Sequence, residues 1–100
     1  MKNLNKESFN KFIQTGQVLV QFSADWCGPC KILSNTLENI IPDATVDIAK
    51  LDIDKCADIA TKYTVRSVPT IIFFENGQEK ARSIGAKNKD AILNFINENL

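Results

Sequence analysis

Apolar residues follow two alternating patterns along the chain, and these patterns predict strands and helices in turn. Short continuous apolar runs bounded by turn residues are typical of buried strands, whereas apolar residues three or four apart are typical of helices. The expected strands are Val18–Ser23, Thr45–Asp52, Thr70–Glu75 and Glu79–Ile84. The first expected helix is capped by Asn5 and runs to about Gln14, and the second opens at Cys27 and Cys30 and ends before Pro42. The third covers Cys56–Tyr63, and the last covers Ala91–Leu100 after a cap at Asn88.

The order of these elements predicts an α/β fold. Three strands alternate with helices as βαβαβ, which is consistent with parallel crossovers. Asn76-Gly77 then indicates a hairpin, and a break at Gly85 precedes the final helix. We therefore expect one central mixed β-sheet with helices on both faces. A length of 100 residues suits a single core, so we expect one domain over residues 1–100.

Charge and composition argue against several partners. Twelve basic residues balance twelve acidic ones, so neither a nucleic-acid surface nor a polybasic membrane patch is indicated. No apolar stretch approaches the length of a membrane span, and Met1–Glu7 has no apolar core like that of a secretory signal. We expect a cytoplasmic protein in a reducing compartment, where three cysteines do not indicate a structural disulfide framework.

The segment Trp26-Cys27-Gly28-Pro29-Cys30 carries the candidate chemistry. A strand that leads through Cys-x-x-Cys into a helix places the first thiol at the helix N-terminus, where thiols become more acidic. Side chains three apart on a helix have Cβ atoms about 5–6 Å apart, and a disulfide needs about 3.5–4.5 Å. A modest tightening closes that gap. We expect Cys27 to be the attacking nucleophile and Cys30 to resolve the mixed disulfide.

A metal site is the alternative for the cysteine pair. Zinc needs four ligands, or three and a water, and the chain offers no histidine and one further cysteine, Cys56. We therefore expect no metal and no bound cofactor, and the absence of histidine excludes a Cys-His hydrolase. Cys56 itself is interpreted as a small buried hydrophobe. The alternative is regulatory oxidation, with a Cys56-linked dimer forming from a protein that is otherwise a monomer.

Many positions along the chain match one family. They are Phe22, Ala24, Trp26-Cys27-Gly28-Pro29-Cys30-Lys31, Lys50, Ile53-Asp54, Val65-Arg66-Ser67-Val68-Pro69-Thr70, Phe73, Asn76-Gly77 and Gly85-Ala86. With these residues the chain resembles the thioredoxins over essentially its whole length. The resemblance implies the thioredoxin fold and a protein-disulfide reductase, an electron carrier that a thioredoxin reductase recharges with electrons from NADPH.

The resemblance also implies a substrate surface around the cysteines. Its residues would be Trp26, Gly28, Pro29, Val68, Pro69, Gly85 and Ala86. Pro69 would follow a cis bond, although X-Pro bonds are cis in only about 5–6% of cases, and Val68 would offer backbone groups to an extended substrate. Taken from the sequence without the family, Trp26 could be a core residue and Gly85 a plain strand-end breaker.

One position departs from the family pattern. Many thioredoxins carry a buried aspartate six residues before the first cysteine, and this chain has Gln21 there. Gln21 cannot titrate, so we expect less assistance for deprotonation of Cys30, and we predict that Gln21→Asp speeds disulfide reduction near neutral pH. Lys50, which matches the aspartate's partner in the family, then becomes an ordinary snorkelling lysine. Asp25 is interpreted as a solvated loop charge.

Two other functions remain open on the sequence. A disulfide oxidase or isomerase would use the same chemistry, although Gly28-Pro29 between the thiols resembles the reducing members of the family. A binding module or partner subunit would not need its thiols at all, and the retention of both cysteines argues against it.

Overall fold

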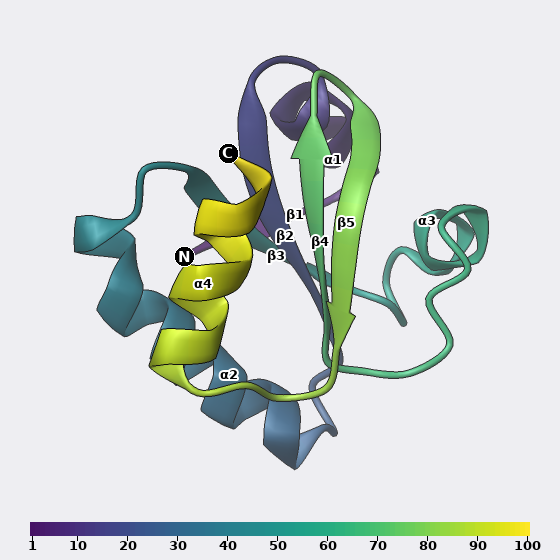
Figure 1. Ribbon diagram of the computed structural model, residues 1–100. Helices are drawn as coiled ribbons and strands as arrows, with labels where there is room; N and C mark the ends of the chain where they lie inside the picture. Colours follow the sequence, from purple (N-terminus) through teal and green to yellow (C-terminus); the bar gives the residue numbers. More distant parts are fainter.

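A computed structural model describes residues 1–100 as a five-stranded sheet with helices packed on it (Figure 1). The strands are β1 (Lys2–Leu4), β2 (Gln17–Ser23), β3 (Asp47–Asp52), β4 (Thr70–Glu75) and β5 (Gln78–Ile84). The helices are α1 (Lys6–Ile13), α2 (Gly28–Ile40), α3 (Ala57–Lys62) and α4 (Lys89–Asn99), with a 3-10 turn at Ile41–Asp43. The predicted α/β class and mixed sheet are confirmed.

The strand order is β1-β3-β2-β4-β5, and one predicted crossover is wrong. β2 and β3 are parallel, as expected, but β4 runs antiparallel to β2. The lengths of the connecting helices explain the difference. α2 has 13 residues and therefore spans about 20 Å, which matches a strand, whereas the 6 residues of α3 span only about 9 Å. α3 is too short to carry the chain back along the sheet, so β4 starts at the end where β3 finishes.

The sequence pattern also missed the edge strand β1. It contains a single apolar residue, Leu4, and forms through parallel pairing with β3, where Leu4 lies opposite Leu51. Some element boundaries also shift: β3 begins at Asp47 rather than Thr45, and α4 begins at Lys89 rather than Ala91. The hairpin at Asn76-Gly77 is confirmed, with positive φ angles of 50° and 85°.

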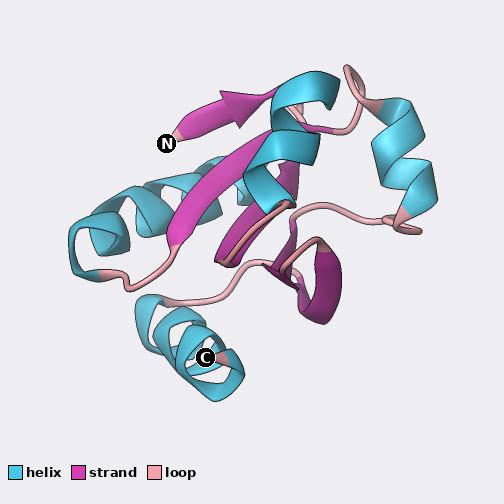
Figure 2. Cartoon of the chain, turned by 90° about the horizontal axis from the view of Figure 1, so that it is seen from above, coloured by secondary structure: helices cyan, strands magenta, loops and turns pink.

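Helices cover both faces of the sheet, as the sequence predicts (Figure 2). α1 and α3 bury Phe9, Ile13, Ile59 and Ala60 on one face, while α2 and α4 bury Leu33, Leu37, Ile40, Ile92 and Ile96 on the other. Strand β2 serves both layers because its side chains alternate. Val20 points into the first core and Leu19 into the second, so β2 is the natural place from which to position a side chain under α2.

Two helix starts have the caps that their sequences indicate. The Asn5 side chain accepts a hydrogen bond from the Ser8 backbone at 2.8 Å, and the Ser8 hydroxyl accepts one from the Asn5 backbone N–H. The Asn88 side chain accepts from the Ala91 backbone at 2.9 Å. No helix in the structure has the length and the apolar character that crossing a membrane requires.

A candidate dithiol–disulfide site at the start of α2

Cys27 and Cys30 form a disulfide between the end of β2 and the first turn of α2. Their Cα atoms are 5.3 Å apart, which lies inside the range of about 4.4–6.8 Å that a disulfide needs. The local sequence makes this possible because the loop leaves the sheet at Ser23 and re-enters regular structure at Gly28. One sulfur therefore caps the helix and the other sits one turn inside it.

The sulfur of Cys27 occupies the N-cap of α2. It accepts a hydrogen bond from the Cys30 backbone N–H at 3.2 Å. Pro29 fills the first turn without presenting an unused N–H, and no acidic side chain lies in that turn to compete for the positive helix end. The helix terminus thus favours negative charge on Cys27 Sγ, by about 0.3–1 kcal/mol from the dipole, with the hydrogen bond in addition.

The two cysteines are both buried and share their apolar neighbours. Cys30 is 1% exposed and Cys27 is 4% exposed, and both pack against Ala24, with Ile53 and Val68 beside them. Cys27 Sγ also lies 3.8 Å from the carbonyl oxygen of Val68. Cys27 therefore lies at the N-cap and Cys30 lies one turn inside the helix, within the same apolar cluster.

Most of the residues expected to form the substrate surface lie near Cys27. The Val68-Pro69 bond is cis, as the resemblance implies. The Gly85 N–H donates to the Pro69 carbonyl at 2.8 Å, which joins Gly85 to the segment that touches Cys27. Gly85 has a φ of 93°, a conformation that suits glycine. Gly28, Pro29 and Ala86 are exposed, and Ala86 follows Gly85 at the edge of this region.

Trp26 is a surface residue, not a core residue. It is 70% exposed, and its indole Nε1 donates to the Asp54 carboxylate at 2.8 Å. Asp54 is itself held because its backbone N–H donates to the Asp52 side chain at 2.8 Å. The β3–α3 turn therefore orients the ring beside Cys27. Sequence reasoning assigned no such contact to Asp54, since only packing reveals that it lies next to a residue 28 positions earlier.

Gln21 lies under α2 and is fully buried at 0% exposure. Its Nε2 donates to the Cys30 carbonyl at 3.0 Å, and its Oε1 accepts from the Ser34 hydroxyl at 2.9 Å. No buried side-chain polar atom in the structure is left without a partner. Gln21 thus bonds the backbone of the second cysteine, and Ser34 is a site residue that the sequence did not indicate.

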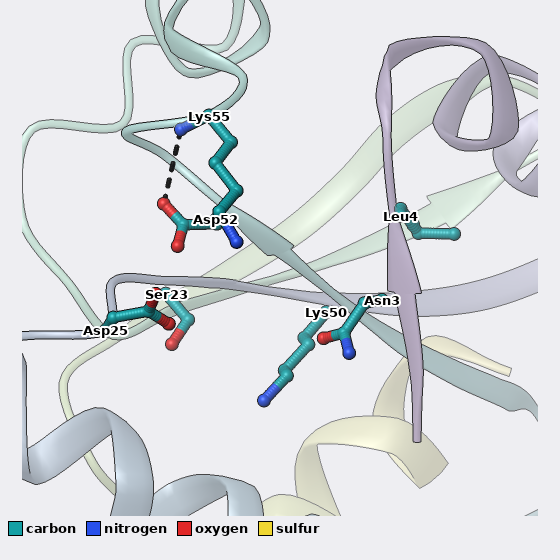
Figure 3. A pocket seen from close by; sticks show the side chains of 7 residues that line it. All are labelled: Asn3, Leu4, Ser23, Asp25, Lys50, Asp52 and Lys55. Carbon is teal, nitrogen blue, oxygen red and sulfur yellow. Dashed lines mark hydrogen bonds between the residues drawn. The ribbon is translucent and has the colours of Figure 1, made fainter.

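A small polar hollow opens beside the site, at the carboxyl ends of β2 and β3 (Figure 3). It has a volume of about 210 Å³ and is lined by Asn3, Leu4, Ser23, Asp25, Lys50, Asp52 and Lys55. Lys50 and Asp25 also line a neighbouring hollow that reaches Ser34. In Figure 3, the Lys50 side chain extends away from Asp52 and Lys55. Two acidic and two basic side chains line the first hollow, so its formal charges cancel.

Cys56 belongs to a different part of the molecule. It is buried at the N-cap of α3, in the core cluster on the α1 and α3 face. Burial raises the pKa of its thiol, and the nearby carboxylates of Asp58 and Asp52 raise it further. No three side chains among histidine, cysteine, aspartate and glutamate come together as a metal-ligand set.

A vicinal cysteine pair at a helix start, able to close a disulfide on this fold, defines a dithiol–disulfide oxidoreductase. Comparison with known proteins identifies the family. The thioredoxin family model matches residues 1–98, so the chain belongs to the thioredoxin family.

Relatives and solved structures agree with this assignment. The thioredoxin of Chlamydia pneumoniae is 43% identical over 98% of this chain and 97% of its own, and that of Rickettsia felis is 37% identical over the same shares. A mutant thioredoxin from Halobacterium salinarum NRC-1 superposes with a TM-score of 0.91 at 29% identity, covering 98% of this chain and 88% of that one. The thioredoxin fold is therefore confirmed.

Proposed function

We propose that the protein reduces disulfides in other proteins, with Cys27 as the nucleophile and Cys30 as the resolving cysteine. The observation that carries this assignment is the position of the two sulfurs. Cys27 Sγ caps the helix and accepts the Cys30 N–H at 3.2 Å, whereas Cys30 lies one turn inside the helix. The helix end supports a thiolate at Cys27, and Cys30 inside the helix lacks that position.

The exchange has two steps that balance. The Cys27 thiolate attacks one sulfur of the substrate disulfide, so a mixed disulfide forms and the other substrate sulfur leaves as a thiolate. Cys30 then loses its proton and attacks Cys27 Sγ, which forms the 27–30 disulfide and releases the second substrate thiolate. Both substrate thiolates take up protons. The substrate gains two electrons, and the protein ends in the oxidised form that the structure presents.

The residues around Cys27 would hold the substrate. Trp26, Gly28, Pro29, Val68, Pro69, Gly85 and Ala86 carry no formal charge. Val68 is the closest of these to the reacting sulfur, with its carbonyl 3.8 Å from Cys27 Sγ. An extended peptide that pairs with the Val68 backbone would bring its own disulfide to Cys27, as in strand addition. Apart from its chain neighbours and the nearby backbone of its own helix, Gly28 has no heavy atom within 4 Å of the position a Cβ would occupy, which leaves room there for a substrate.

The remaining parts of the proposal concern partners and place. The oxidised protein must regain two electrons, and we assign this step to a thioredoxin reductase that draws on NADPH, with no cofactor bound to the protein itself. We further propose that the protein works as a cytoplasmic monomer within electron transport and redox homeostasis. Membership of the thioredoxin family supports these assignments.

Insulin reduction by the reduced protein, coupled to NADPH and a thioredoxin reductase, tests the proposal. Cys27→Ser should abolish turnover, Cys30→Ser should stall at a mixed disulfide that non-reducing gels detect, and Cys56→Ser should match the wild type. Equal activity in Cys27→Ser would overturn Cys27 as the nucleophile, and partner binding that survives the loss of both thiols would favour a binding module. Equilibration with glutathione adds the direction: a protein that glutathione readily reduces would be an oxidase or isomerase instead.

A further inference from the structure

Backbone hydrogen bonds hold the start of α2, from the Cys27 N–H to the Ala24 carbonyl and from the Lys31 N–H to the Cys27 carbonyl, and two side chains add to them. Two hydrogen bonds involve side chains here: Cys30 N–H to Cys27 Sγ, and Gln21 Nε2 to the Cys30 carbonyl. The first uses the reacting sulfur of Cys27, and Pro29 offers no N–H. Of these two side-chain bonds, only the bond from Gln21 is independent of the redox state.

The hydrogen bond that caps α2 is weakest in the mixed disulfide, the state from which Cys30 must react. In the mixed disulfide the Cys27 sulfur is bonded to the substrate and carries no charge, so its hydrogen bond from Cys30 N–H is weaker than that of a thiolate. The covalent link to Cys30 is also absent at this stage. The turn must nevertheless hold Cys30 Sγ aligned for attack on Cys27 Sγ, because a small misplacement of reacting atoms lowers the rate sharply.

The hydrogen-bond directions of Gln21 follow from its neighbours. A backbone carbonyl can only accept, so Nε2 must face Cys30, and Oε1 then faces the Ser34 hydroxyl, which donates. Cys30 and Ser34 are four residues apart and therefore lie on one face of α2. One buried side-chain amide on β2 is thus hydrogen-bonded to two successive turns of the helix. Neither Gln21 nor Ser34 ionises in the physiological range.

We infer that Gln21 and Ser34 form a neutral clamp that positions Cys30 for the resolving step. This inference rests on the proposed function. Gln21 and Ser34 are positioning residues because they touch the backbone that carries the reacting atom and not the sulfur itself. Charged side chains facing the hollow that reaches Ser34 are Asp25, Lys31 and Lys50. None of them is a hydrogen-bond partner of Gln21.

A single-turnover assay isolates the resolving step. Cys27 is loaded with a coloured aryl thiol as a mixed disulfide, and release of that thiol by Cys30 is followed by absorbance in a Cys56→Ser background. Gln21→Met keeps the length and the apolar stem of the side chain while removing both hydrogen bonds. It should slow release by about 2- to 10-fold, the range that one modest hydrogen bond spans. Ser34→Ala should slow release by a smaller factor.

Three further measurements separate positioning from general damage. Val20→Ala perturbs the same strand on its opposite face, and it should leave the release rate within about 2-fold of wild type. The double variant should be no slower than Gln21→Met, since both changes break one clamp. The first attack, measured in Cys30→Ser, should be equally fast with and without Gln21→Met.

The inference is overturned if Gln21→Met releases the thiol as fast as Val20→Ala does, if the two single effects multiply in the double variant, or if the first attack slows to the same extent as release. A Cys30→Ser protein whose Cys27 does not attack the aryl disulfide at all contradicts the proposed function instead, so the two failures are distinguishable.

Discussion

Replacing Gln21 by aspartate tests what a buried acid would do at this site. Gln21 is fully buried, and an aspartate side chain is one methylene shorter. The 3.0 Å bond to the Cys30 carbonyl would therefore be lost. Gln21→Asn is the matched control, because asparagine has the size of aspartate and no charge. Any difference between the two variants comes from the carboxylate.

The expected stability change depends on pH. Burial disfavours the carboxylate and raises its pKa, while Lys50 in the adjoining hollow opposes this. With a net rise in pKa of about two units, the folded Gln21→Asp variant holds a proton that the unfolded chain releases between about pH 4 and pH 6. The aspartate variant should therefore match the asparagine variant below about pH 4 and be less stable by about 2.7 kcal/mol above about pH 6.

The rate should move in the opposite direction. Loss of the clamp slows the resolving step by about 2- to 10-fold, but a general base contributes about 10²- to 10⁴-fold when it takes the proton directly or through one water. The base outweighs the clamp, so Gln21→Asp should reduce disulfides faster than wild type near neutral pH, and Gln21→Asn should be slower. Urea unfolding and single-turnover release measure the two effects. The reasoning fails if the aspartate and asparagine variants have the same stability at every pH, or if the aspartate variant is no faster than wild type.

Three other outcomes follow from the structure. Cys56 should alkylate far more slowly than a thiol in urea at neutral pH, because burial raises its pKa, and an oxidant-induced dimer that disappears in Cys56→Ser would contradict this. The exposed Lys6–Asp58 pair, 2.9 Å apart, lowers the pKa of Asp58 and raises that of Lys6. Its small stabilisation should be lost as the pH falls below 3.8 or rises above 10.5, and Lys6→Met should remove both changes in thermal denaturation. Phe9→Ala should lower the free energy of unfolding by about 3–5 kcal/mol in urea, because Phe9 is 1% exposed among aromatic rings; a loss below about 1 kcal/mol would refute the packing argument.

Local patterns predicted most of the elements because each long apolar run or helical face signals its own secondary structure. The strand Thr70–Glu75 is one continuous run of buried side chains up to its last residue, and the sequence shows it directly. The direction of this strand cannot be predicted from its own residues, because it depends on which strand it pairs with. β4 pairs antiparallel with β2, and only the short length of α3 indicates this. β1 escaped notice because its three residues contain one apolar side chain.

The residues of the site also fall into two groups: those that the local sequence predicts and those that only the fold brings together. Cys27 and Cys30 are three residues apart, so a helical turn brings them together without any knowledge of the fold. Val68 lies 41 residues from Cys27 and was expected there only through the family resemblance. Ser34 was not expected at all. Its contact with Gln21 joins a strand to a helix, and it exists because α2 packs over the face of β2 that the odd-numbered side chains share.

Cys27 has two roles with conflicting requirements: its sulfur reacts, and the same sulfur caps the helix. A reactive sulfur must change its bonding during each cycle, yet a helix cap must persist if the turn behind it is to stay in register. The chain uses one atom for both, since Cys27 Sγ accepts the Cys30 N–H at 3.2 Å. A cap contributes about 0.5–2 kcal/mol, and part of this is lost when the substrate occupies the sulfur. The buried amide of Gln21 supplies a bond of comparable size that no step of the exchange touches. A neutral side chain at position 21 is therefore compatible with activity because it secures the position of Cys30, even though it cannot accept its proton.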